Sequence, residues 1–251
     1  MPRYPSRSFS SYSFGPGGLS PALKALIGVN VAVFLLQFFF PIVTDVLGLR
    51  PIFVVRDFWV WQLATYMFLH GGAFHIIFNM LALWMFGTDL ERRWGARYFL
   101  RFYLVTGVGA GVLTVLFSLL PFGPAQQLFR ANVIGASGAI YGVLLAYALY
   151  FPDRPIYMYF VFPIPAKVFV AIIGAIAFLP SLGDSGGVAS ATHLGGLAVA
   201  YVYLKSGRGR GRLHPFADVK YRYLKWKINR LRKKFDVYSG GRSNDYDRRV
   251  H

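Results

Sequence analysis

The sequence predicts an all-α membrane protein whose chain crosses the bilayer six times. Of its 251 residues, 55% are hydrophobic and only 15% are charged, which is too apolar for an ordinary soluble domain. Several apolar runs approach the length of about 20 residues that a helix needs to span a bilayer. The Lys and Arg residues also gather at particular loops and ends, as they do in polytopic membrane proteins.

Six apolar segments account for the predicted spans. They lie at about 22–44, 73–90, 98–120, 134–151, 167–182 and 190–205. The last three are short or interrupted by glycine, which suits helices packed inside a bundle because small residues let backbones approach. Gly107 and Gly111 on the third span, and Gly138 and Gly142 on the fourth, have the four-residue spacing of such contacts.

Two connections between these spans have a distinct composition. Residues 45–72 are apolar but broken by polar side chains, and their Trp and Tyr residues suit the headgroup region, so we expect a partly inserted loop. Residues 152–166 contain four prolines, which exclude a continuous helix and indicate a connecting loop.

The sequence divides into three regions. Residues 1–20 are rich in Ser, Gly and Pro and are expected to be disordered; their Arg and Ser without acids also fit an organellar transit peptide, which remains an alternative. No cleavable signal peptide is evident, so the first apolar run is expected to act as a signal anchor. The membrane domain is expected at 21–205, followed by a basic tail at 206–251.

The net charge of +17 is unevenly distributed and predicts the topology. Residues 205–251 hold 15 of the 27 Lys and Arg residues and 4 of the 10 acidic ones. A basic tail can bind nucleic acid, but in a membrane protein positive charge marks the cytoplasmic side, so no nucleic acid partner is expected. With both termini inside, 24 of the 27 basic residues are cytoplasmic. We therefore expect a multi-pass protein of the cell membrane, in which Ser137 and His193 lie near the outer ends of the fourth and sixth spans.

The tail also carries a helical pattern at about 216–235. Apolar residues recur there at intervals of four and three, surrounded by Lys and Arg: Ala217, Tyr221, Leu224, Ile228, Leu231 and Phe235. Such an amphipathic helix can lie on an anionic inner leaflet, or it can pack against the cytoplasmic loops of the protein itself. The sequence leaves both readings open.

A serine and a histidine stand out within the apolar spans. Ser137 follows Gly135 on the fourth span and is followed by Gly138, while His193 lies on the sixth. Polar residues at membrane depth are functional candidates, and a neighbouring histidine can activate a serine as a nucleophile. Either residue alone is more often structural, but the two glycines clear space around the hydroxyl. Their combination favours a Ser–His hydrolytic dyad.

Four further residues are expected to support this dyad. Tyr141 lies four residues after Ser137, on the same helical face, where its ring can orient the imidazole. His75 and Asn79 share one face of the second span and are expected to stabilise an oxyanion, although interhelical hydrogen bonding is the alternative. His70 is expected to shape the preceding loop by hydrogen bonding.

No metal or other cofactor is expected. The chain has no cysteine, which excludes thiol catalysis and Cys-ligated zinc. A metal held by His70, His75 and His193 is conceivable, but no carboxylate lies near them. The nearest carboxylate to the outer ends of the fifth and sixth spans is Asp184, so we expect a dyad and not a triad.

These motifs, in this order, resemble the rhomboid family of intramembrane serine proteases over about 20–205. His75 and Asn79 resemble its oxyanion pair, and Glu91-Arg92-Arg93-Trp94-Gly95 resembles its signature at the cytoplasmic end of the second span. Gly135-Ala136-Ser137-Gly138 with Tyr141 resembles the nucleophile motif, and Ala191-Thr192-His193-Leu194-Gly195-Gly196 the base motif. Trp61, Thr65, Phe68 and His70 resemble its first loop.

The resemblance implies a six-helix bundle with the dyad in a water-filled cavity open to the outer face. It implies cleavage of transmembrane protein substrates in or near their spans, with the Ser137 amide completing the oxyanion hole and the fifth span gating lateral entry. Two alternatives remain. One is a catalytically silent relative that binds membrane clients, which the intact dyad argues against; the other is a transporter, for which no inverted repeat is visible.

Overall fold

The computed structural model describes residues 18–158, 162–178, 187–206, 223–228 and 230. The chain divides into two units, Met1–Arg212 and Leu213–His251. Most of the N-terminal segment predicted to be disordered, the carboxylate of Asp184 and most of the predicted tail helix lie outside the described residues.

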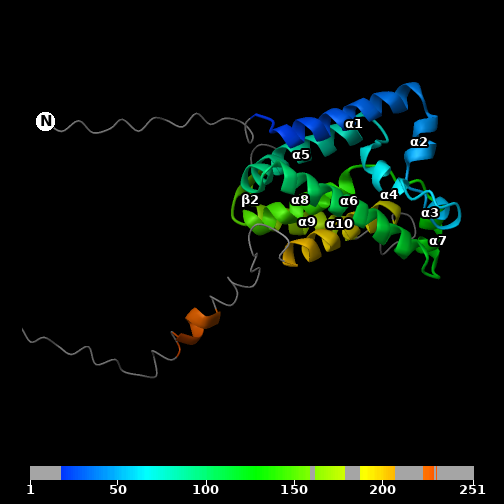
Figure 1. The fold of residues 1–251 in the computed structure, drawn as a ribbon. Coiled ribbons are helices and arrows are strands. Elements are labelled where there is room, and N and C mark those ends of the chain that lie inside the picture. The colour runs from blue at the N-terminus through cyan, green and yellow to red at the C-terminus, as the bar shows by residue number, and fades with distance from the viewer. Residues whose placement is uncertain (1–17, 159–161, 179–186, 207–222, 229, 231–251) are drawn as a thin grey trace, which may run out of the picture. The chain divides into compact units, whose positions relative to one another are not determined.

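The described part of the first unit is mostly helical (Figure 1). Its long and medium helices are α1 (Pro21–Phe39), α5 (Ala73–Trp94), α6 (Ala96–Ser118), α8 (Ser137–Tyr150), α9 (Ala166–Phe178) and α10 (Gly187–Lys205). Its short helical segments are α2 (Ile42–Leu47), α3 (Pro51–Arg56), α4 (Gln62–Thr65), the 3-10 turn η1 (Tyr66–Phe68) and α7 (Gly123–Arg130). The strands β1 (Pro155–Met158) and β2 (Phe162–Pro165) form an antiparallel hairpin.

The helices agree with the predicted apolar segments, with two instructive differences. Within the described residues, α1, α5 and α6 are long and apolar enough to cross a membrane, and α8 and α9 are shorter apolar helices. The first helix ends at Phe39 instead of about 44, just before Pro41. The fourth begins at Ser137 instead of about 134, because Gly135 has φ +130° and interrupts the helical conformation.

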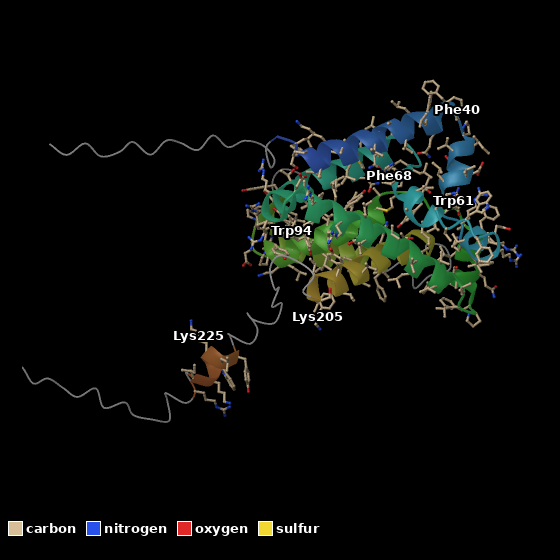
Figure 2. The ribbon with its side chains drawn as sticks, in the orientation of Figure 1. Phe40, Trp61, Phe68, Trp94, Lys205 and Lys225 are labelled. Carbon is tan, nitrogen blue, oxygen red and sulfur yellow. The ribbon has the colours of Figure 1, made fainter. Side chains whose placement is uncertain are left out.

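The connections contain more regular structure than the sequence indicates. The segment 45–72 holds the second half of α2 together with α3, α4 and η1. The proline-rich segment 152–166 forms the β1–β2 hairpin, in which Pro155 pairs with Pro165. Figure 2 shows Phe40 and Trp61 at one end of the helical unit and Trp94 and Lys205 at the other.

A buried carboxylate joins α5 to the beginning of α1. Glu91 is only 4% exposed, and it accepts a hydrogen bond from the Ser20 hydroxyl. It also accepts from the backbone N–H groups of Ala22 at 3.0 Å and Leu23 at 3.2 Å. The first N–H groups of a helix have no partner within it, and the positive end of its dipole favours an anion. Glu91 thus caps α1 across about 70 residues of sequence.

Aromatic rings close the turn from α5 to α6. The Trp94 ring makes edge contacts with Tyr98, Phe102 and Tyr150, at centroid distances of 5.1, 5.1 and 5.2 Å. Gly95 has φ +83°, a conformation that favours glycine, and it permits the reversal between the two helices. Trp94 and Gly95 belong to the signature predicted at the end of the second span. Through Trp94 the end of α5 packs against the beginning of α6 and the end of α8.

Glycines set the distance between α8 and α10. A Cβ atom placed on Gly196 would lie 1.9 Å from the carbonyl oxygen of Gly138, and one on Gly142 would lie 2.2 Å from the Thr106 side chain. A Cβ on Gly107 would lie 2.1 Å from the Met67 side chain. At Gly196 the neighbouring atom is backbone, which leaves no room for a side chain, whereas at Gly142 and Gly107 it belongs to a side chain of a neighbouring element. These contacts agree with the close packing expected for the small residues of these spans.

The described residues of the second unit form a short helix. Residues 223–228 and 230 are helical, and Leu224 and Ile228 are exposed on it, four residues apart. The guanidinium of Arg230 lies 5.3 Å from the centroid of the Trp226 ring. This segment lies within the helix predicted at about 216–235, the rest of which falls outside the described residues.

The contact between Gly196 and Gly138 predicts a severe effect of a single methyl group. Gly196→Ala should lower the stability by about 1–3 kcal/mol or more, because the helices must separate to admit the Cβ. Gly174→Ala on α9 is the matched control, since its Cβ would meet only Leu197 at 3.7 Å. Thermal unfolding in detergent micelles measures both. Equal melting temperatures for the two variants would contradict the close approach of α8 and α10.

Candidate active site

The segment before α8 is extended and is held by backbone hydrogen bonds. Val133 and Leu49 exchange N–H···O bonds of 2.8 and 2.9 Å, and the Gly135 N–H donates to the carbonyl of Tyr66 at 2.9 Å. After Gly135 the chain turns, so that Ser137 becomes the first residue of α8. Because the extended backbone is paired with the first connection, a non-helical segment is tolerated next to apolar helices.

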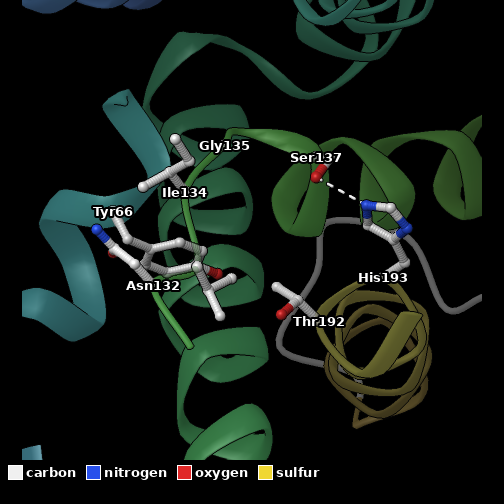
Figure 3. A pocket seen from close by; sticks show the side chains of 8 residues that line it. Tyr66, Asn132, Ile134, Gly135, Ser137, Thr192 and His193 are labelled. Carbon is white, nitrogen blue, oxygen red and sulfur yellow. Dashed lines mark hydrogen bonds between the residues drawn. The ribbon is translucent and has the colours of Figure 1, made fainter. Parts of the chain in front are cut away.

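The structure brings the two predicted dyad residues together. His193 lies on α10, and its Nε2 is 2.8 Å from the Oγ of Ser137 (Figure 3). The ring of Tyr141 stacks on the His193 ring, with centroids 4.2 Å apart and planes inclined by 12°. This stack fixes the plane of the imidazole, as the helical spacing of Ser137 and Tyr141 predicts.

His75 on α5 lies beside the same serine. Its Nδ1 accepts a hydrogen bond from the Gly71 N–H at 3.2 Å. A Cβ placed on Gly135 would lie 2.9 Å from His75 Nε2 and 3.6 Å from Ser137 Oγ. The position left empty by this glycine is therefore within reach of both the imidazole and the serine hydroxyl, and any side chain there would fill it.

Asn79 follows one turn later on α5 and is buried. Its Nδ2 donates to the carbonyl of His75 at 2.9 Å. An amide nitrogen carries two hydrogens, so this bond uses one of them. The imidazole of His75 thus borders the space beside Gly135 and Ser137, whereas one hydrogen of the Asn79 amide is used within α5.

A small cavity of about 130 Å³ opens beside the dyad. It is lined by Tyr66, Asn132, Val133, Ile134, Gly135, Ser137, Thr192 and His193 (Figure 3). Two of the lining residues have hydroxyl groups that are hydrogen-bonded within the protein. The Tyr66 hydroxyl donates to the Gly107 carbonyl at 2.7 Å, and the hydroxyls of Thr192 and Thr114 are 2.9 Å apart. Neither Tyr66 nor Asn132 carries a sequence signal that would predict its position here.

His70 is anchored differently from the prediction. The loop is held through its backbone, because the Gln37 Oε1 on α1 accepts the His70 N–H at 2.9 Å. Its ring is buried, and within the described residues neither ring nitrogen has a hydrogen-bond partner. The ring instead makes an edge contact with His75, with centroids 5.1 Å apart. Nothing in the sequence marks Gln37, which lies in an apolar run.

No cluster for a metal is found in the part of the chain that the structure describes. Among these residues no group of three or more His, Cys, Asp or Glu side chains could hold an ion. The rings of His70 and His75 contact each other, His75 Nδ1 accepts from the Gly71 N–H, and His193 is bonded to Ser137.

Comparison with known proteins assigns this arrangement to a family. Residues 57–208 match the Rhomboid domain model. Rhomboid protein 1, mitochondrial, of Saccharomyces cerevisiae is 31% identical over 185 residues, which cover 71% of this chain and 51% of the relative. Rhomboid protease AarA of Providencia stuartii is 26% identical over 221 residues, which cover 77% of this chain and 76% of the relative. Rhomboid protease GluP of Bacillus subtilis is 40% identical over 84 residues, which cover 34% of this chain and 14% of the relative.

The chain spans about half the length of the yeast relative and less of several others. The match nevertheless includes α5 to α10 and the residues Ser137, His193, Tyr141, His75, Asn79 and His70. The chain therefore belongs to the rhomboid family, and it is a multi-pass membrane protein.

Proposed function

We propose that this chain is an intramembrane serine protease that hydrolyses peptide bonds in or near the transmembrane segments of membrane proteins. The observation that carries the proposal is the 2.8 Å contact between His193 Nε2 and Ser137 Oγ. A serine with a histidine at this distance is a nucleophile with its general base. The family membership supports a membrane-embedded peptide bond as the target.

The proposed reaction proceeds through an acyl-enzyme. Ser137 Oγ attacks the substrate carbonyl while His193 Nε2 takes the hydroxyl proton, and the same imidazolium then protonates the leaving amine. A water molecule deprotonated by His193 hydrolyses the ester. Tyr141 keeps the imidazole plane aligned with Oγ through both proton transfers, because its ring is stacked on His193.

Three donors are proposed to hold the oxyanion. They are His75 Nε2, the Asn79 amide and the backbone N–H of Ser137. The Ser137 N–H belongs to the first residue of α8, so it has no partner within the helix, and the helix dipole favours negative charge there. Donors fixed in a site with little water stabilise a developing charge strongly. The space left by Gly135 between His75 and Ser137 supports this location.

We propose that α1, α5, α6, α8, α9 and α10 are six spans of one membrane domain, residues 21–205, arranged as a rhomboid bundle. α8 has 14 residues and is therefore about 21 Å long, which is shorter than a hydrocarbon core of about 30 Å. If its end at Tyr150 lies at the inner surface, Ser137 lies about 10 Å below the outer surface. The extended segment 131–136 then covers the remaining depth and leaves room for water.

We place both termini in the cytoplasm and the protein in the cell membrane. The basic residues support this orientation, since Arg92, Arg93, Arg97 and Arg101 all lie at or near the junction of α5 and α6, and 15 more lie at 205–251. The polar segment 1–20 and the tail 206–251 are then two cytoplasmic regions flanking the membrane domain.

The tail helix is proposed to contact the inner leaflet. Within the described residues Tyr223, Leu224, Trp226 and Ile228 are all exposed, next to Lys225 and Lys227. Apolar side chains flanked by cations suit an interface rich in anionic lipids, where each Lys or Arg contributes about 1 kcal/mol.

Removing either dyad residue should abolish cleavage. In liposomes with a transmembrane model substrate, Ser137→Ala and His193→Ala should each lower the cleavage rate by roughly 10³-fold or more. Ser118→Ala is the matched control, because Ser118 lies in α6 and donates only to the Val115 carbonyl. Cleavage that survives Ser137→Ala would exclude it as the nucleophile. The absence of both cleavage and labelling of Ser137 by a fluorophosphonate would favour the silent client-binder.

The orientation can be read from single cysteines, because the natural chain has none. Gln127→Cys on α7 and Ser206→Cys after α10 both replace exposed residues. A membrane-impermeant maleimide should label Gln127→Cys in intact cells, whereas Ser206→Cys should react only after permeabilisation. The reverse pattern would place both termini outside.

A peptide of residues 216–235 tests the lipid contact. It contains one tryptophan, Trp226, whose fluorescence should shift to the blue on vesicles with anionic lipid. We expect binding at least about tenfold tighter than to zwitterionic vesicles, because several cations face the surface. Equal binding to both vesicle types, or no binding, would favour packing of the helix on the protein's own loops.

A further inference from the structure

The hydrogen bond to His75 Nδ1 determines which tautomer this histidine adopts. A backbone N–H can only donate, so the Gly71 amide at 3.2 Å requires a lone pair on Nδ1. A neutral imidazole whose Nδ1 carries no hydrogen must carry it on Nε2. The Gly71 contact therefore leaves His75 with an N–H at Nε2.

That tautomer is the one the proposed reaction needs. His75 Nε2 faces the empty position beside Gly135, 2.9 Å from a Cβ built there, and the same point is 3.6 Å from Ser137 Oγ. An N–H in this place stabilises an oxyanion, whereas the other tautomer would present a lone pair to the negative charge. The role of His75 thus depends on which of its nitrogens is protonated.

The peptide unit that contains the Gly71 N–H is held from its other end. The carbonyl of that unit belongs to His70, and the Gln37 Nε2 on α1 lies 3.4 Å from its oxygen. A peptide unit is planar, with its C=O and N–H pointing in opposite directions. A bond that orients the His70 carbonyl therefore also orients the Gly71 N–H toward His75.

The Gln37 side chain itself has one possible orientation. Its Oε1 accepts the His70 N–H at 2.9 Å, and this bond requires an oxygen because a backbone N–H cannot accept. The nitrogen of the same amide then points to the His70 carbonyl, and it also donates to Thr44 Oγ1 at 2.9 Å. The buried ring of His70, packed against His75, holds the segment in place from the other side.

We infer that Gln37 is a positioning residue for the oxyanion hole, which acts through the His70–Gly71 peptide to hold His75 as the Nε2–H tautomer. The inference rests on the proposed protease function for its effect on rate. The effect of Gln37 on the tautomer of His75 does not depend on whether the protein cleaves a substrate.

Nitrogen-15 NMR of the full chain with labelled histidine tests this link directly. The His75 signals are identified by their loss in His75→Asn. The wild type should show Nδ1 without hydrogen and Nε2 with hydrogen. Gln37→Met, which keeps the length of the side chain but none of its three hydrogen bonds, should show a mixture of the two tautomers. Leu35→Met is the matched control, since Leu35 is on the same helix and 52% exposed.

The kinetic readout separates positioning from folding. Gln37→Met should lower kcat by about tenfold, less than the loss of a whole oxyanion donor, and leave KM unchanged. Leu35→Met should change neither. An unaltered tautomer in Gln37→Met, or a raised KM with an unchanged kcat, would overturn the inference.

A second pair of variants decides the question if Gln37→Met does not fold. Gly71→Pro removes the N–H, whereas Gly71→Ala keeps it, and the new Cβ would meet nothing closer than 3.7 Å. Gly71→Ala should keep the single Nε2–H tautomer, whereas Gly71→Pro should show a mixture of the two tautomers. A single Nε2–H tautomer in both variants would refute the role of the amide. A wild type with the expected tautomer but no cleavage of substrate would refute the protease function and leave the link intact.

Discussion

The contact of α8 with α10 is the constraint on which the candidate site depends. Ser137 begins one of these helices and His193 lies on the other, so their 2.8 Å separation reflects how closely the two backbones approach. Gly196 and Gly138 permit that approach because a single Cβ would meet a carbonyl oxygen at 1.9 Å. In a membrane, where lipid and side chains are equally apolar, close packing of this kind replaces the hydrophobic effect as the force between helices.

A second constraint is the cost of unpaired backbone in an apolar environment. The chain leaves the helical conformation before Ser137 and so exposes peptide groups that a helix would satisfy. Leu49 and Tyr66, both from the connection between α1 and α5, supply the missing partners. The first connection is thus part of the site's framework, since it holds the segment that turns at Gly135.

The parts of the site that could be predicted from the sequence are those whose geometry follows from spacing on one helix. Ser137 and Tyr141 are one turn apart, so the stacking of Tyr141 on His193 needed only the pairing of the two helices. His75 and Asn79 were likewise placed on one face of α5. The boundaries of α1 and α8 were less predictable, because Pro41 and Gly135 act inside runs that remain apolar on both sides.

Gln37, Tyr66 and Asn132 could not be predicted, for a common physical reason. Each acts through a contact with a segment distant in sequence: Gln37 with His70, Tyr66 with the Gly107 carbonyl, and Asn132 with the carbonyl of Thr44. A lone polar residue in an apolar run has no periodic neighbours that would show which face is bound. Only the packed arrangement of the helices shows which polar groups meet.

The placement of polar groups on α1 has a consequence for the order of assembly. α1 has 19 residues and is about 28 Å long. In the proposed bilayer arrangement, Ser20 just before it and Gln37 near its end therefore lie close to the two edges of the hydrocarbon core, where water can solvate them. Asn30, in the middle, donates to the carbonyl of Leu26 on its own helix. The partners of both ends, Glu91 and the His70 backbone, are synthesised later. In this proposed arrangement α1 enters the bilayer first and exchanges water for protein at both ends when α5 arrives, so that one docking event captures the two ends together.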